Sequence, residues 1–390
     1  MNERKHPKSV TVLSILLAVT VFLLILSTIF SATVLLCFSP SELLQLAAVK
    51  KVIENNFIFD YDEESLTAGT MAGMVEKLGD PYSRYLTTEE YEEFTYEVLG
   101  EFGGIGVTMR LDDEKKRIVV SEIQPDSPAK KEGVLEQDEI LAIDGEPVST
   151  DIEKTARRVR GEVGSRVTIT FHRPSEDRTF DLTFKREKLT LNSVTAQRFD
   201  DTLGYLRISA FNSTTAEETL NALKDLEQEG VTELILDLRD NIGGSVKAAE
   251  KIADYFLDEG TIYQMISKSG KSVMVKSDAH YDPIPMVVLV NDGTASASEL
   301  LCGALQDRGR AILVGDTTFG KGIMQKNFHF PDGVLTLTFA EYATPNGTHI
   351  HEKGITPDLP VSLSEEDRYR WPTLTVDQDP QLLAAIKAIV

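Results

Sequence analysis

Apolar strand-like stretches alternate with helical stretches in the second half of the chain, and this alternation restricts the possible folds more than any other feature. The strand-like stretches cover residues 203–208, 233–238 and 286–290, and helical spacing of apolar residues is found over 216–229 and 246–257. Strands alternating with helices are typical of an α/β core. We therefore expect such a core, with a largely parallel central sheet.

Two segments rich in small and polar residues follow strands of this core. Residues 240–244 come after the second strand and residues 291–298 come after the third. Ligands of α/β proteins bind outside the carboxyl ends of the parallel strands. The sequence therefore places a functional site where these two segments meet.

Length and charge limit the classes of protein that this chain can belong to. With 390 residues it exceeds one ordinary core, which predicts two or three folded units. The formal net charge of -22 argues against nucleic-acid binding, because a protein that neutralises phosphates needs a basic face. The two cysteines, Cys37 and Cys302, are too few for a disulfide framework.

The segment 10–37 contains no charged residue and is longer than the roughly 20 apolar residues that cross a bilayer. A cleavable signal peptide has a shorter apolar region of about 7–15 residues, so an uncleaved membrane helix is expected. Arg4, Lys5 and Lys8 precede the segment, which favours a cytoplasmic amino terminus. We expect a single-pass protein of the cell membrane whose catalytic part lies outside the cytoplasm.

Residues 100–107 read GEFGGIGV and open a series of short elements. Strands are expected at 117–120, 139–143 and 166–172, and Ser127 is expected to cap a helix. This order resembles a PDZ domain. The resemblance implies that a peptide is added as a strand and that backbone N–H groups bind its terminal carboxylate. It also implies the peptide-binding residues Gly103, Gly104, Ile105 and Gly106.

The chain is expected to divide into five parts. They are a cytoplasmic stub with a transmembrane anchor (1–41), a helical segment (42–95), a PDZ-like domain (96–187), an α/β core (188–365) and a tail with a short helix (366–390).

A serine and a lysine lie 25 residues apart, each within a run of small residues. Residues 293–299 read GTASASE and residues 315–322 read GDTTFGKG. Ser296 lies at a strand-to-helix turn, where a hydroxyl can attack a substrate but needs a neighbour to accept its proton. No histidine lies close to either run, so Lys321 is the candidate base. A free lysine has a pKa of about 10.4. Burial would lower the pKa and supply the neutral amine.

Paired glycines end the strand that reads LILDLRDNIGG over residues 234–244. Their N–H groups can point at a developing negative charge, and the N–H of Ala297 lies near the positive end of a helix dipole. We expect Gly244 and Ala297 to form an oxyanion hole. Gln325 follows Lys321 by four residues, which places both on one side in a helix or in a strand, so Gln325 could hold the amine.

Together these motifs resemble the carboxyl-terminal processing peptidases, also called tail-specific proteases. The resemblance rests on the PDZ-like series and on residues 78–86, 238–244, 291–307, 314–325 and 354–358. It implies Ser296 as nucleophile, Lys321 as general base, Gln325 as third active-site residue, and Gly244 with Ala297 as the oxyanion hole. Two stretches depart from the family pattern: residues 240–242 read DNI where Asn-Pro or Asn-Asn-Pro usually precedes the glycines, and Thr294 replaces a serine.

The resemblance implies a membrane-anchored serine endopeptidase that recognises C-terminal tails of extracytoplasmic proteins and cleaves them through an acyl-enzyme with a Ser-Lys dyad. No metal or organic cofactor is expected. Its partners would be protein or peptide substrates and the membrane, and residues 380–386 could also support a homodimer. Two alternatives remain open, an inactive membrane-tethered PDZ scaffold and an α/β hydrolase acting on small esters or thioesters. His349 and His351 have the spacing of two metal ligands, but no third ligand pattern lies nearby.

Overall fold

The structure is a computed structural model, and it describes residues 17, 19–22, 39–112, 116–278 and 283–389. The chain separates into two compact units, Met1–Leu66 and Thr67–Val390. The first unit contains helix α2 (Pro40–Asn56) and the start of α3 (Glu63–Glu76). A capping box begins α2: the Ser39 hydroxyl accepts from the Glu42 N–H, and the Glu42 carboxylate accepts from the Ser39 N–H.

The single-pass membrane localisation expected from the sequence is corrected here. None of the helices in the described ranges combines the length and the apolar character that crossing a bilayer requires. For example, α2 has 17 residues and includes the charged residues Glu42, Lys50, Lys51 and Glu54. Most of the expected span, residues 10–37, lies outside the described residues.

The PDZ-like series of elements is confirmed in the second unit. Its strands form a six-stranded antiparallel sheet in the order β3-β4-β5-β7-β8, with β6 paired to β5, and β2 pairs separately with β9. Ser127 caps α5 as expected, since its hydroxyl accepts from the Lys130 N–H at 3.3 Å. Ile105, Ile140 and Phe171 are among the buried residues of its core. The elements are β2 (Glu101–Gly104), β3 (Val107–Asp112), β4 (Arg117–Ile123), α5 (Pro128–Lys131), β5 (Glu139–Ile143), β6 (Glu146–Pro147), α6 (Ile152–Val159), β7 (Arg166–Arg173), β8 (Arg178–Lys185) and β9 (Glu187–Thr190).

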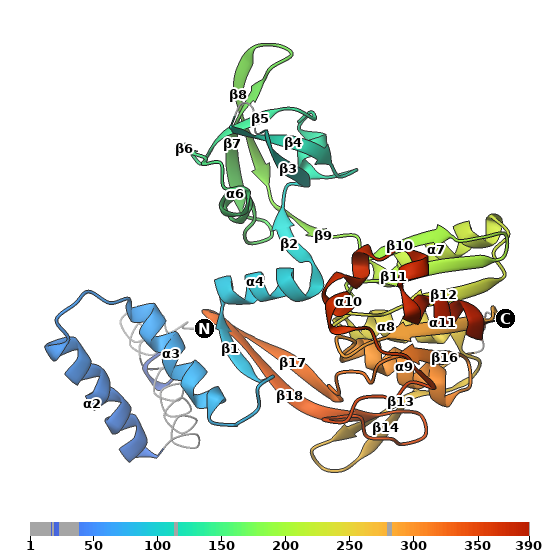
Figure 1. The fold of residues 1–390 in the computed structure, drawn as a ribbon. Helices are drawn as coiled ribbons and strands as arrows, with labels where there is room; N and C mark the ends of the chain where they lie inside the picture. Colours follow the sequence, from blue (N-terminus) through green and yellow to red (C-terminus); the bar gives the residue numbers. More distant parts are fainter. Residues whose placement is uncertain (1–16, 18, 23–38, 113–115, 279–282, 390) are drawn as a thin grey trace, which may run out of the picture. The chain divides into compact units, whose positions relative to one another are not determined.

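The α/β core is built on a six-stranded sheet in the order β10-β11-β12-β15-β16-β19 (Figure 1). This sheet is mixed, which corrects the expectation of a largely parallel one: β10 pairs antiparallel with β11, whereas the pairings from β11 to β19 are parallel. The strands are β10 (Val194–Arg198), β11 (Leu203–Ile208), β12 (Glu233–Asp237), β15 (Met286–Val290), β16 (Ile312–Gly315) and β19 (Leu359–Pro360).

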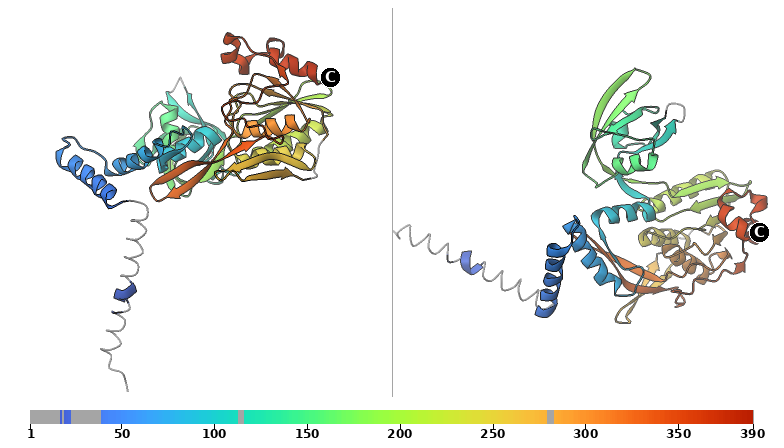
Figure 2. Two further views of the ribbon diagram at one scale, coloured as in Figure 1. Left: turned by 90° about the horizontal axis from the view of Figure 1, so that it is seen from below. Right: turned by 60° about the vertical axis from the view of Figure 1, so that its left-hand side comes forward.

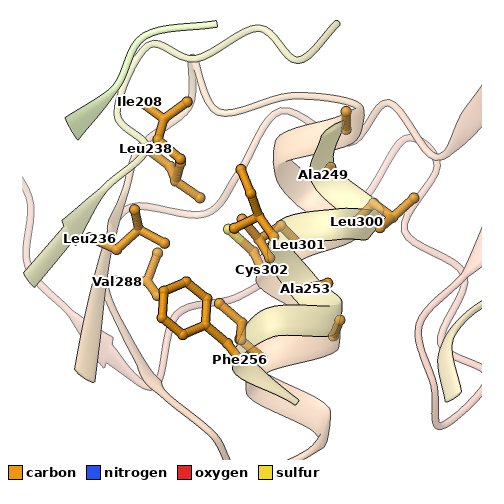
Figure 3. Close-up of a cluster of buried hydrophobic side chains, with 14 of the residues drawn as sticks. Ile208, Leu236, Leu238, Ala249, Ala253, Phe256, Val288, Leu300, Leu301 and Cys302 are labelled. Atoms are coloured by element: carbon orange, nitrogen blue, oxygen red, sulfur yellow. The ribbon is translucent and has the colours of Figure 1, made fainter. Parts of the chain in front are cut away.

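Alternate side chains of the buried strands point to opposite faces of this sheet, as the period of a strand requires. Leu234 and Leu236 pack into one apolar cluster with helices α7 (Thr215–Gln228), α8 (Val246–Phe256) and α9 (Ala297–Asp307). Figure 3 shows part of this cluster, in which Phe256 and Leu301 lie near Leu236 and Val288. Ile235 between them belongs to a second cluster on the other face.

The C-terminal helix α11 (Pro380–Ala388) covers that second face. Its buried Leu382 and Ala385 belong to the same cluster as Ile235, Val287 and Leu289. The apolar face that suggested a homodimer therefore packs against the sheet of its own chain. The expected homodimer is not supported.

A second sheet, antiparallel, extends from the core. It contains β13 (Gly260–Ser267), β14 (Ser272–Ser277), β17 (Ile323–Phe330) and β18 (Gly333–Ala343). The orange hairpin of β17 and β18 is prominent in Figures 1 and 2. Strand β1 (Arg84–Thr87), which precedes helix α4 (Thr88–Leu99), pairs with β18 so that Arg84 lies opposite Thr336. This pairing brings residues 80–87 next to the strands that follow Lys321.

Candidate active site

Three turns leave neighbouring strands of the central sheet at the same edge. We call them the glycine turn (238–245, after β12), the serine turn (291–298, after β15) and the lysine turn (316–322, after β16). Strands β12, β15 and β16 are consecutive and parallel, and Leu289 pairs with Asp237 on one side and with Val314 on the other. Because carboxyl ends of parallel strands coincide, the three turns meet, as the sequence predicted for the first two.

Ser296 sits in a strained backbone conformation at the start of α9. Its φ of 57° and ψ of -117° lie outside the regions that residues other than glycine normally adopt. Hydrogen bonds to the glycine turn hold the segment in place: the Thr294 hydroxyl donates to the Leu238 carbonyl at 2.9 Å, and the Ser298 hydroxyl donates to the Asn241 carbonyl at 2.8 Å. These two hydroxyls therefore bind the backbone of the glycine turn.

Gly243 brings the glycine turn into direct contact with the serine turn. A Cβ atom on Gly243 would lie 2.7 Å from the Ala295 carbonyl oxygen, 2.8 Å from Ser296 Cβ and 2.9 Å from the Ala297 nitrogen. Its φ of 97° is also one that residues with a side chain rarely adopt. The next residue, Gly244, is equally crowded, since a Cβ there would lie 2.1 Å from the Phe211 carbonyl oxygen. Only glycines fit at both positions.

A buried carboxylate joins the serine turn to the lysine turn. One oxygen of Glu299 accepts the N–H groups of Ser296 at 2.9 Å and Lys321 at 2.8 Å. Its other oxygen accepts the Thr318 hydroxyl at 2.6 Å and the Gly320 N–H at 2.7 Å. Glu299 is fully buried, and hydrogen bonds to a charged group are worth more than those between neutral groups. The distance between the two turns is thereby fixed.

Tyr342 joins the same two turns from β18. Its hydroxyl lies 2.6 Å from the carbonyl oxygen of Ser296 and 3.0 Å from that of Lys321, so one hydroxyl hydrogen is shared between two acceptors. Burial raises the pKa of Tyr342 well above its usual value, which keeps the hydroxyl protonated as a donor. The main chains of Ser296 and Lys321 are thus linked by two side chains, by Glu299 through their N–H groups and by Tyr342 through their carbonyl groups.

The surroundings of Lys321 favour its neutral amine. Burial is the largest cause that lowers the pKa of Lys321, and the positive charge of Arg84 lowers it further. The carboxylates of Asp80 and Glu299 act in the opposite direction. The Nζ atom lies 4.7 Å from the centre of the Tyr82 ring. Asp80 and Tyr82, which precede β1, and Arg84, its first residue, therefore contribute to the environment of the amine.

The links between Ser296 and Lys321 join their backbones and not their side chains. Within the described ranges, no hydrogen bond joins Ser296 Oγ to Lys321 Nζ, and the links run through Glu299 and Tyr342. The Gln325 amide donates to the Thr338 hydroxyl at 3.1 Å. Thr338 in turn donates its N–H to the Ser83 hydroxyl at 3.0 Å. Gln325 thus lies on the hairpin strand that continues from the lysine turn.

Sequence reasoning missed Glu299, Tyr342 and Tyr82 as parts of the site. A signal existed for Glu299, because a serine followed three residues later by glutamate at a helix start is the capping-box pattern. Tyr342 comes from an element that is distant in sequence and that no motif marks. Tyr82 lies within the motif over residues 78–86 but was given no role there.

Comparison with known proteins shows the family of the chain. Residues 202–361 match the model of peptidase family S41, residues 103–184 match the PDZ domain, and residues 31–90 match the N-terminal domain of the activating protease CtpB. The carboxyl-terminal-processing protease of Picosynechococcus sp. is 38% identical over 293 residues, which cover 73% of this chain and 70% of that protein. The chain belongs to the carboxyl-terminal-processing protease family. It is therefore a serine-type peptidase.

Two further members of the family match over more of the chain. The carboxyl-terminal-processing protease of Synechocystis sp. is 36% identical over 88% of this chain and 80% of its own length. The carboxy-terminal processing protease CtpA of Bacillus subtilis is 34% identical over 84% of this chain and 70% of its own length. Both matches are too long to be confined to one domain, so the family resemblance seen in the sequence is confirmed.

Proposed function

We propose that the protein is an endopeptidase that cleaves unstructured protein tails through an acyl-enzyme, with Ser296 as nucleophile and Lys321 as general base. The observation that carries the proposal is the Glu299 carboxylate, which accepts the backbone N–H of both residues through a single oxygen. A nucleophile and its base must lie within hydrogen-bond reach during the reaction, and contacts in the absence of substrate are often looser.

In the first half of the reaction, the neutral amine of Lys321 accepts the proton of the Ser296 hydroxyl as the oxygen attacks the substrate carbonyl carbon. The carbonyl oxygen gains a negative charge between the N–H groups of Gly244 and Ala297. The contact of Gly243 with the Ala297 nitrogen supports this assignment, because it brings the two turns together. The lysine ammonium then gives its proton to the leaving amine, and the C–N bond breaks.

In the second half, water attacks the ester formed on Ser296, and Lys321 again accepts a proton. The acid is released when the ammonium returns that proton to the Ser296 oxygen. The lowered pKa of Lys321 supports both roles, since a base is most effective when its pKa is near the working pH.

Capture of the substrate tail is assigned to the PDZ domain. Gly103 and Gly104 end strand β2, which pairs with β9, and Ile105 and Gly106 follow it. Three carbonyl groups of this segment already have donors: Gly103 accepts from Gly161, Ile105 from Ala129, and Gly106 from Gln124. The N–H groups of the segment are the proposed donors to a terminal carboxylate. A cavity of about 630 Å³ beside Gly103 is lined by Arg157, Arg160 and Lys188 and also by Glu89, Glu92, Glu93 and Glu101, so its charges do not select for a carboxylate.

Two comparisons test this function. Ser296→Ala and Lys321→Ala should each abolish cleavage of casein while the circular dichroism spectrum stays unchanged, and full activity in either variant would refute its assignment. A peptide substrate with a free C-terminal carboxylate should bind and be cleaved better than its amidated form. A wild-type protein that binds the free peptide but cleaves nothing would indicate an inactive scaffold instead.

A further inference from the structure

The segment after the protease core contacts each of the three turns of the site. Arg368 lies on α10 (Glu365–Arg370), Trp371 begins the short helix η1 (Trp371–Thr373), and Gln381 lies in α11. We call these three residues the C-terminal clamp. All three lie beyond residues 202–361, which match the S41 family model. The clamp is therefore a feature of this chain outside the matched core.

The first contact is made with the glycine turn. The indole N–H of Trp371 donates to one carboxylate oxygen of Asp240. The other oxygen accepts the Asn291 side-chain amide at 2.8 Å, and the Asp240 N–H donates to the Asn291 side-chain oxygen at 2.9 Å. Asp240 has a φ of 56°, unusual for a residue with a side chain, so its conformation depends on these bonds. Asp240 is also one of the positions that depart from the family pattern.

The second and third contacts are made with the other two turns. The Arg368 guanidinium forms an ion pair at 3.0 Å with Asp292 in the serine turn. The side-chain amide of Gln381 donates at 3.1 Å to the carboxylate of Asp316 in the lysine turn. Each member of the clamp thus contacts a different turn.

The clamp is anchored on a buried arginine. The Arg239 guanidinium lies 4.1 Å from the Trp371 ring centre, and it contacts Asp379 at 2.7 Å and Gln381 at 3.2 Å. It also binds Asp237 at the end of β12. Arg239 is 1% exposed, so its charge depends on these partners. Trp371 itself is 4% exposed. The indole ring therefore has little freedom to move away from Asp240.

We propose that Trp371 is a positioning residue, which holds the glycine turn through Asp240 so that the Gly244 N–H faces the substrate carbonyl. The inference rests on the proposed function. The indole does not reach the reacting atoms, and its effect passes through the shape of the turn. Misplacing an active-site group by about 1 Å can lower a rate about 100-fold. One lost hydrogen bond should have a smaller effect, of roughly tenfold in kcat.

The test compares Trp371→Phe with Arg370→Ala in the full-length protein. Phenylalanine keeps a ring against Arg239 but cannot donate to Asp240. Arg370 ends α10, directly before Trp371, and its guanidinium pairs with two residues of α10, Glu366 at 3.0 Å and Asp367 at 3.9 Å. Fluorescein-labelled casein gives kcat and KM, and hydrogen exchange followed by mass spectrometry reports on the backbone of residues 238–245.

Trp371→Phe should lower kcat about tenfold with KM within twofold, and should speed exchange within residues 238–245. Arg370→Ala should match the wild type in both measurements. Equal kcat for the two variants, or a loss of kcat with no local change in exchange, would overturn the positioning role. If Trp371→Phe does not fold, Arg368→Ala is tested instead. Hydrogen exchange is then monitored in the serine turn, residues 291–298. If the wild type and Ser296→Ala are equally inactive, the proposed function fails. In that case, unchanged hydrogen exchange in Trp371→Phe would also show that Trp371 does not hold the glycine turn.

Discussion

Replacing Glu299 by glutamine tests whether one buried carboxylate both holds the site together and influences the lysine. The substitution keeps the shape of the side chain but exchanges one oxygen for an NH₂ group. Four donors point at the two oxygens, two at each. If the NH₂ group faces Thr318, that hydroxyl can turn and accept, and the Gly320 N–H alone loses its acceptor. In the other orientation, the N–H groups of Ser296 and Lys321 both lose theirs.

A buried donor without an acceptor costs about 1–3 kcal/mol, so the free energy of unfolding should fall by about 1–6 kcal/mol, depending on the orientation. Urea unfolding followed by circular dichroism measures this loss. Glu218→Gln is the matched control. Glu218 is a carboxylate on α7 that accepts from the Ser193 N–H and hydroxyl at 3.0 Å and from the Thr214 hydroxyl at 2.6 Å. Its substitution should destabilise the fold by a similar mechanism, away from the lysine.

The pH dependence separates the two variants. The active form of Lys321 is neutral, so kcat/KM rises as the pH increases through the pKa of Lys321. Glu299 raises that pKa, and removing its charge should move the rise to lower pH. The other groups that influence the amine, Asp80, Tyr82 and Arg84, are unchanged. A rise that stays in place, or moves to higher pH, in Glu299→Gln would refute the electrostatic argument, whatever the loss of stability. In Glu218→Gln the rise should not move.

Three further predictions follow from the same geometry. Arg84→Gln removes a charge that lowers the pKa of Lys321, so the rise of kcat/KM should move to higher pH, opposite to Glu299→Gln, and an unchanged profile would contradict this. Gly243→Ala should destabilise by about 2 kcal/mol or more and reduce casein cleavage below about a hundredth, because its Cβ would lie 2.7–2.9 Å from the serine turn. Gly270→Ala has a comparable φ of 77° but open space around it, and it should keep full activity. The Cys302 thiol is fully buried, and burial raises its pKa. In a Cys37→Ser variant, iodoacetamide should therefore modify Cys302 only when urea unfolds the protein. Rapid labelling of the native protein would show that the core opens there.

The buried strands of the core were the part of the fold that the sequence predicted best. Strands β11, β12 and β15 are buried on both faces and appear as continuous apolar runs, so their bounds match the structure within one residue. Strand β10 does not: its sequence VTAQR is mostly exposed, and its antiparallel pairing with β11 makes the sheet mixed. The expected membrane helix and the expected homodimer both came from apolar segments whose packing partners in the chain were not considered. For residues 380–386, the apolar partner was the chain's own sheet.

The sequence predicted the turns that carry the candidate site, but not the side chains that connect these turns. Ser296 and Lys321 follow strands that the chain order and the parallel sheet bring together, which is why local motifs were sufficient. The position of Tyr342 depends on the register between β17 and β18, and that of Tyr82 on the pairing of β1 with β18, across about 250 residues of sequence. No short-range pattern encodes such pairings, because they depend on the packing of the whole second unit.

The order in which the chain is made gives the C-terminal clamp a further consequence. A ribosome completes the three turns before it adds Arg368, Trp371 and Gln381. A growing chain can therefore form the sheet while the glycine turn still lacks its tie to Trp371. Removal of residues 365–390 would return a finished molecule to that condition, with Ser296 and Lys321 intact but without the clamp contacts to their turns.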